Sequence, residues 1–111
     1  MEVNFFTYGN SACSLDYMRK LQPNEYADVY HVIQCLENEE FEIIGARKWQ
    51  DKIYEVHFRR NNRLFYVLDA GVIWILYACK KSKKKTSKID AKKIKILYQR
   101  FLNWKNTDNN K

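Results

Sequence analysis

Side chains able to carry acid–base and phosphate chemistry are concentrated between residues 53 and 63. Residues 53–59 alternate between apolar and polar types, which is typical of a β-strand whose successive side chains point to opposite faces. One face is expected to hold the core with Tyr54, Val56 and Phe58. The opposite face would carry Ile53, Glu55, His57 and Arg59.

A second strand is expected to bring further cations to this polar face. Asn61-Asn62 is a plausible hairpin turn, so Arg63 should begin the next strand close to Arg59. Tyr77 and Lys81 would join the same surface if their strand presents them on that side of the sheet. The surface would then combine an imidazole, a phenol, two guanidinium groups and an ammonium.

These are the group types that RNA cleavage without a metal or cofactor requires. A base takes the 2′-OH proton, an acid protonates the leaving 5′-oxygen, and cations stabilise the charge on the phosphoryl oxygens. Imidazole titrates near neutral pH, so His57 could act as either proton carrier. The candidate catalytic residues are therefore His57, Arg59, Arg63, Tyr77 and Lys81.

Each candidate also has an ordinary structural explanation. A single histidine on a strand is more often a surface or packing residue, and arginines commonly flank turns. Tyr77 lies within an apolar stretch, where a tyrosine is usually part of the core. Spacing alone therefore leaves the catalytic and the structural interpretations open.

A lysine run over residues 80–85 is the stronger charge signal. Five ammonium groups within six residues repel one another unless an anion neutralises them, and lysines contact phosphates without reading base sequence. The candidate RNA-binding residues are Arg60, Lys80, Lys83, Lys84 and Lys85. The alternative is a solvated lysine surface that aids solubility.

Charge is divided unevenly along the chain. Residues 1–45 carry eight acidic and two basic side chains, a net charge of −6, whereas residues 46–111 carry 18 basic and five acidic ones, a net charge of +13. This asymmetry favours a polyanionic partner, most commonly nucleic acid, at the basic end.

The remaining pattern predicts an α+β domain. A strand over residues 3–8 is followed by a short helix over residues 15–21 and a second helix from Pro23, which together form an N-terminal helical hairpin. The second helix would bury one face through Tyr26, Val29, Tyr30, Ile33 and Leu36. Residues 41–50 connect it to the rest and hold a turn or short strand.

An antiparallel sheet of about four strands would pack on this hairpin. Its later strands are expected at residues 63–69 and 72–79, with a turn at Ala70-Gly71. The second of these is apolar almost throughout, as in a central strand covered on both faces. Residues 88–104 have the spacing of an amphipathic helix, with Lys88, Lys92, Lys95 and Gln99 outside its apolar stripe.

Length and composition predict one domain over residues 1–104 and a polar tail over residues 105–111. Cys13, Cys35 and Cys79 lack any CxxC or Cys/His spacing, so we interpret them as small buried side chains. No secretory signal is visible and the longest apolar tract is too short to span a bilayer as a helix, which predicts a cytoplasmic protein.

The order of these segments resembles the RelE-like toxins of bacterial toxin–antitoxin systems, particularly the HigB-type and phage-derived branch. The resemblance rests on YEVHFR at residues 54–59, RLFYVL at 63–68, VIWIL at 72–76 and KKSKKKT at 80–86, followed by the terminal helix. It covers residues 52–102, and the preceding helices fit the same order.

The resemblance implies an endoribonuclease that cleaves mRNA, commonly on the ribosome, and a cognate antitoxin protein that blocks it. It implies that Arg59 and Arg63 bind the scissile phosphate, that His57 carries a proton, and that Lys81 replaces an arginine. The sequence departs from the family where Tyr77 stands for a frequent histidine, where Ala78-Cys79 stands for Gly-Phe, and where Ser87 stands for a tyrosine or proline.

Three functions are compatible with these features. The first is a metal-independent mRNA interferase. The second is a non-catalytic module that binds RNA or the ribosome, which the departures at Tyr77 and Ser87 favour. The third is a phage-derived interaction protein whose lysines recruit an acidic partner peptide.

Overall fold

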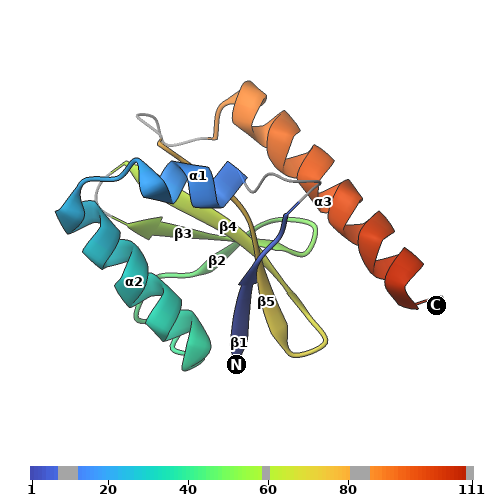
Figure 1. Cartoon of the computed structure of the whole chain (residues 1–111), viewed down its shortest axis with the longest axis horizontal. Coiled ribbons are helices and arrows are strands. Elements are labelled where there is room, and N and C mark those ends of the chain that lie inside the picture. Colours follow the sequence, from blue (N-terminus) through green and yellow to red (C-terminus); the bar gives the residue numbers. More distant parts are fainter. Residues whose placement is uncertain (8–12, 59–60, 81–85, 110–111) are drawn as a thin grey trace.

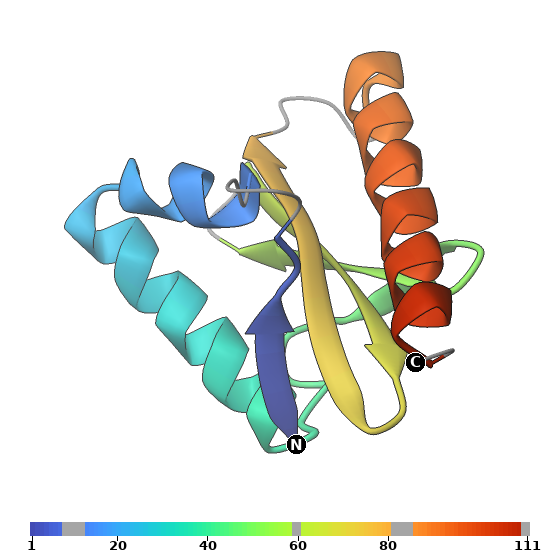
Figure 2. The ribbon, with the colours of Figure 1, turned by 45° about the vertical axis from the view of Figure 1, so that its right-hand side comes forward.

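The chain folds as a five-stranded mixed sheet with helices on both of its faces (Figures 1 and 2). The computed structural model describes residues 1–7, 13–58, 61–80 and 86–109, with the side chains of 13–15 and 108–109 excluded. The elements are β1 Glu2–Phe5, α1 Cys13–Arg19, α2 Pro23–Glu37, β2 Arg47–Gln50, β3 Ile53–Phe58, β4 Asn62–Asp69, β5 Val72–Lys80 and α3 Lys88–Asn109.

The strand order is β1-β5-β4-β3-β2, and all neighbouring strands are antiparallel except β1 and β5. The expected α+β class is confirmed, but the sheet has five strands rather than about four, and it is mixed. β1 pairs in parallel with β5, Glu2 opposite Val72, because the chain leaves β1 through two helices and re-enters the sheet at the far edge. Residue periodicity identifies a strand without identifying its partner.

The two N-terminal helices do not form the predicted hairpin. α1 lies over β5, whereas α2 lies over β1 and β3. Figures 1 and 2 show the two helices running at a wide angle to each other. The turn after Arg19 and Pro23 at the start of α2 redirect the chain, so each helix packs on the sheet instead of on the other.

The buried face of α2 also differs from the predicted one. Tyr26 and Tyr30 are exposed, whereas Val32 and Cys35 are buried together with the expected Val29 and Leu36. The side of α2 that packs on the sheet carries residues 29, 32 and 36. The adjacent side, with Tyr26 and Tyr30, has the same helical spacing, so periodicity alone could not show which of the two sides is buried. Cys35 and Cys79 are buried thiols, as expected for small core side chains, and Cys13 lies outside the described side chains.

Two apolar cores flank the sheet. On one face Met18, Val29, Val32 and Leu36 of α1 and α2 pack on alternate residues of β3, β4 and β5. On the other face Ile94, Leu97 and Phe101 of α3 pack on the remaining alternate residues. β5 is therefore covered on both faces, as its continuous apolar run predicted.

The side of β3 that was expected to carry the polar side chains is largely buried. Ile53 and Glu55 are both buried on the α3 face, and Trp49 of β2 packs there against Phe65. Asn62, predicted to be a turn residue, is instead the first residue of β4, buried and paired with Phe58. The hairpin turn at Ala70-Gly71 is confirmed, and α3 continues to Asn109, beyond its predicted end at residue 104.

Candidate active site

A buried carboxylate on β3 organises the polar side chains on the α3 face of the sheet. Glu55 lies opposite Arg47 of β2, and two residues along the strand His57 lies opposite Arg63 of β4. Side chains two apart on a strand share a face, so the register brings these residues together. We call them the Glu55 cluster: Arg47, Glu55, His57 and Arg63.

One oxygen of Glu55 receives every side-chain contact that the described residues make with this carboxylate. Its Oε1 atom accepts hydrogen bonds from Arg47 Nε at 3.3 Å and Arg47 Nη2 at 3.2 Å, and it lies 2.9 Å from His57 Nε2. Arg63 Nη1 forms an ion pair with the same oxygen at 3.3 Å and also contacts His57 Nε2. Arg47 Nη2 lies 3.2 Å from His57 Nε2 as well, so this nitrogen is surrounded by a carboxylate and two guanidinium groups, whereas Nδ1 makes none of these contacts.

Members of the cluster differ sharply in solvent access. The side chains of Glu55 and Arg63 are 5% and 8% exposed, whereas those of His57 and Arg47 are 37% and 62% exposed. Glu55 Oε2 and Arg63 Nε are buried and have no hydrogen-bond partner among the described residues. A ligand from solvent can therefore reach His57 and Arg47 directly, but not the buried pair beneath them.

The cluster shifts the protonation equilibria of its two titratable members. Burial lowers the pKa of His57, the nearby charges of Arg63 and Arg47 lower it further, and the hydrogen bond and charge of Glu55 only partly oppose them. Burial acts to raise the pKa of Glu55, but the hydrogen bond and charge of His57, with Arg63 and Arg47, outweigh it and lower that pKa. At neutral pH the site therefore contains a carboxylate, a neutral imidazole and two guanidinium ions.

Tyr77 lies on the same face of the sheet as the Glu55 cluster. This placement was the condition under which the sequence predicted a surface shared by Tyr77, His57 and Arg63. A β-bulge in β5, where Phe65 pairs with Tyr77 and Tyr66 with Ile75, shifts the alternation by one residue. Tyr77 is only 8% exposed, and its hydroxyl donates a 2.8 Å hydrogen bond to Asp90 Oδ1 in the first turn of α3. Asp90 also makes two hydrogen bonds with Ser87. The Ser87 hydroxyl donates to Asp90 Oδ2, and its oxygen accepts a hydrogen bond from the Asp90 backbone N–H, which caps the start of α3.

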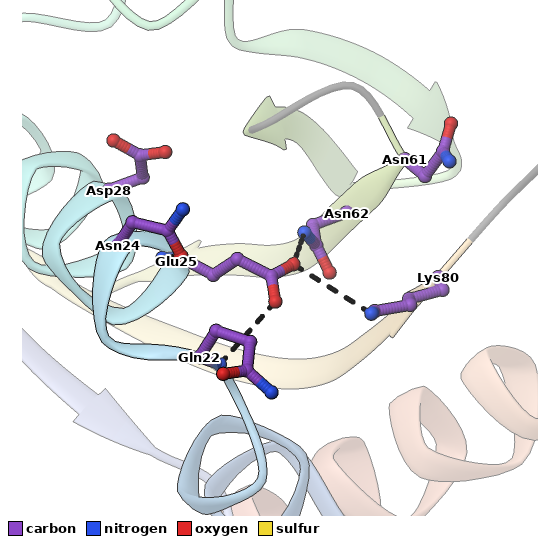
Figure 3. A pocket seen from close by; sticks show the side chains of 7 residues that line it. All are labelled: Gln22, Asn24, Glu25, Asp28, Asn61, Asn62 and Lys80. Atoms are coloured by element: carbon purple, nitrogen blue, oxygen red, sulfur yellow. Dashed lines mark hydrogen bonds and ion pairs between the residues drawn. The ribbon is translucent and has the colours of Figure 1, made fainter.

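Lys80 lies on the opposite face, in a polar pocket of about 590 Å³ (Figure 3). Its ammonium is 3.8 Å from Glu25 Oε2, and that oxygen also accepts a 2.6 Å hydrogen bond from Asn62. Pairing with Glu25 reduces the positive charge that Lys80 offers to a phosphate. The other lining residues are Gln22, Asn24, Asp28 and Asn61.

Comparison with known proteins assigns the chain to a family. Residues 16–101 match the model described as phage-derived protein Gp49-like (DUF891). The chain belongs to the Gp49-like family. None of the curated proteins searched matches it significantly.

The Gp49-like match begins within α1 and ends within α3, so it includes the Glu55 cluster, Tyr77 and Lys80. The other candidate residues of this Gp49-like chain, Arg59, Arg60, Lys81, Lys83, Lys84 and Lys85, lie outside the described residues. The structure therefore brings together His57, Arg63 and Tyr77 on one face and places Lys80 on the other.

Two residues of the Gp49-like site were not predicted. Arg47 lay in the segment treated as a connector; a hairpin of residues 47–50 with 53–58 would have placed it opposite Glu55. Asp90 follows Ser87 by three residues, a capping signal at the start of a helix. The capping signal is local, but the contacts of Arg47 with Glu55 and of Asp90 with Tyr77 depend on which elements lie side by side.

No helix in the described part of the Gp49-like chain combines the length and apolar character needed to cross a membrane. Within the same residues no three His, Cys, Asp or Glu side chains are grouped as metal ligands would be.

Proposed function

We propose that this Gp49-like protein is a metal-independent endoribonuclease, the toxin of a type II toxin–antitoxin pair that cleaves ribosome-bound mRNA. The observation that carries the proposal is the Glu55 cluster, in which an accessible neutral imidazole lies beside an accessible guanidinium group. The resemblance of residues 52–102 to RelE-like toxins of the HigB type supports the same activity, and a cognate antitoxin is the expected protein partner.

In this mechanism His57 acts as the base through Nδ1, with its ring proton on Nε2 and donated to Glu55 Oε1. It removes the 2′-OH proton as the 2′-oxygen attacks phosphorus, the bond to the 5′-oxygen breaks, and a 2′,3′-cyclic phosphate results. Arg47, 62% exposed, is the described cation best placed to stabilise charge on the phosphoryl oxygens. The leaving oxygen takes its proton from water or from a group outside the described residues.

The buried residues have positioning roles in this proposal. Glu55 and Arg63 hold the imidazole from the side of Nε2, so Arg63 acts through His57 rather than on the phosphate. Tyr77, bonded to Asp90, fixes the start of α3 over the sheet. The expected direct contact of Arg63 and Tyr77 with RNA is replaced by these supporting roles.

The test is mRNA cleavage after induction in bacteria, and in vitro with purified protein and translating ribosomes. His57→Gln and Arg47→Gln are each expected to reduce cleavage by roughly 10²-fold or more. Lys48→Gln changes a neighbouring exposed lysine on the other face of β2 and should leave cleavage within about twofold. Equal cleavage by wild type and His57→Gln would remove the proposed mechanism.

A second candidate is a non-catalytic RNA- or ribosome-binding module of the same fold. The burial of Arg63 and the bonding of Tyr77 to Asp90 favour it, because both remove expected catalytic groups from solvent. Salt-dependent ribosome binding by the wild type, with intact mRNA under the same conditions, would support this module over the enzyme.

A further inference from the structure

The outer side of α3 carries a stripe of cations and amides that the proposed active site does not use. Ile94, Leu97 and Phe101 are buried against the sheet, so the opposite side of the helix faces solvent (Figure 2). That side presents Lys88, Lys92, Lys95, Gln99 and Asn103, all exposed. Their spacing of three or four residues places them on one line along the helix.

These residues border a groove of about 600 Å³ along the helix surface. None of the three lysines lies within ion-pairing distance of a carboxylate in the described part of the chain. Like charges three and four residues apart on a helix repel, and an anion that spans them relieves this repulsion. The stripe therefore favours an extended ligand with several negative charges.

We propose that this stripe is a second nucleic-acid contact, which binds the backbone of duplex RNA. Lys88 and Lys95 are separated by seven residues, about 10 Å along the helix, and a duplex presents a phosphate charge about every 1.7 Å of its axis. Gln99 and Asn103 extend the line with amides that both donate and accept hydrogen bonds, which suits the ribose 2′-OH. The choice of RNA over DNA rests on the proposed function.

The types of residue that line the groove favour a nucleic-acid duplex over other polyanions. Single-stranded RNA is usually bound through aromatic stacking, and none of the groove residues is aromatic. An anionic membrane would require an apolar face on the helix, but the apolar face of α3 is already buried against the sheet. Ile96 is the one aliphatic side chain longer than alanine in the groove.

Binding of a blunt 16-base-pair RNA duplex, measured over a range of salt concentrations, tests the inference. The stripe variant Lys88→Gln/Lys92→Gln/Lys95→Gln should lower the slope of log Kd against log salt by about two to three, near 0.9 for each lost phosphate contact. A charge-matched control, Lys20→Gln/Lys52→Gln/Lys93→Gln, changes exposed lysines off the stripe and should reduce the slope by less than one. Circular dichroism should show the same helix content in both.

Three outcomes would overturn the inference: equal loss of duplex binding in both variants, no loss in the stripe variant, or an equal loss for a 16-nucleotide single strand. Equal affinity for a DNA duplex of the same sequence would overturn the choice of RNA. The result is distinguishable from that for the proposed function, because His57→Gln should reduce cleavage by roughly 10²-fold or more without changing duplex binding. Loss of duplex binding in the stripe variant would stand even if the protein cleaved no RNA.

Discussion

Glu55 occupies an unusual position for a carboxylate, because its side chain is buried on the face of the sheet that α3 packs against. Removing such a charge from water is costly unless oppositely charged hydrogen-bond donors surround it. Arg63 is buried beside it, and Arg47 and His57 close the side nearest solvent. The stability of each buried charge therefore depends on the other.

Replacing Glu55 with glutamine should destabilise the fold strongly. Glu55→Gln leaves the buried Arg63 guanidinium without its counter-charge, a change that costs about 3–5 kcal/mol in comparable pairs. Urea denaturation at neutral pH would measure the loss. Arg47→Gln removes the exposed partner of the same carboxylate and should cost about 1 kcal/mol or less. Similar losses in the free energy of unfolding for Glu55→Gln and Arg47→Gln would show that the burial of a charged partner does not determine how much it stabilises the fold.

The lowered pKa of His57 predicts the pH dependence of cleavage. A base must be neutral to accept a proton, and a pKa below the ordinary 6.5 keeps the imidazole neutral to lower pH. Cleavage should therefore rise with pH and reach half its maximum below pH 6.5. A midpoint at or above 6.5, or a residual activity of His57→Gln that keeps the wild-type midpoint, would contradict the assignment of His57 as the base.

At the scale of elements, the bulge in β5 determines which side chains share the site. Before the bulge Ile73 and Ile75 face α1 and α2, and after it Tyr77 and Cys79 face α3. Strict alternation would place Tyr77 with Ile73 and Ile75, away from the Glu55 cluster. A single extra residue on the strand therefore brings Tyr77 to Asp90.

The β4–β5 hairpin offers a test of the local backbone. Ala70 and Gly71 form its two-residue turn with φ values of 50° and 78°, a conformation that costs free energy for a residue with a Cβ atom. Ala70→Gly should therefore stabilise the fold by about 0.5–1 kcal/mol, and Gly71→Ala should destabilise it by a similar amount. Thermal unfolding would measure both. If Ala70→Gly lowered the stability and Gly71→Ala raised it, the positive φ angles of this turn would not be a source of backbone strain.

Sequence patterns predicted most elements and the antiparallel partners within the two hairpins β3–β4 and β4–β5, but not the partners of β1 and β2. The strands around Val56, Phe65 and Ile75 and the terminal helix were recognised because their periodicity is local. The parallel pairing of β1, the burial of Glu55 and the contribution of Arg47 depend on contacts between segments far apart in the chain. A polar residue on a strand carries no signal of whether a helix will cover it.

At the scale of the whole molecule, helices lie on both faces of the sheet, and the cluster lies on the same face as α3. The two titratable groups of the cluster, Glu55 and His57, make the free energy of unfolding depend on pH. The folded-state pKa values of His57 and Glu55 lie below their ordinary values of 6.5 and 4.5. Between each ordinary pKa and the lowered one, the unfolded chain therefore binds more protons than the folded chain. Their contributions are complete above pH 6.5 and are lost as pH falls through each lowered pKa.

We expect the thermal midpoint to fall as the solution is acidified below pH 6.5, and to fall further below pH 4.5. His57→Gln should remove the first decline, because glutamine does not titrate, and should keep a smaller second decline, because Arg63 and Arg47 still lower the pKa of Glu55. Differential scanning calorimetry from pH 7.5 to 3.5 would resolve the two. An unchanged first decline in His57→Gln would assign it to another group.

The parallel pairing of β1 with β5 has a consequence for synthesis of the protein. Glu2 must meet Val72, so the first strand waits for about 70 residues before its partner exists, and loops of that length close slowly. α2 packs on β1, and α1 packs on β5. Until β5 has left the ribosome, the N-terminal third of the nascent chain lacks the strand against which it folds.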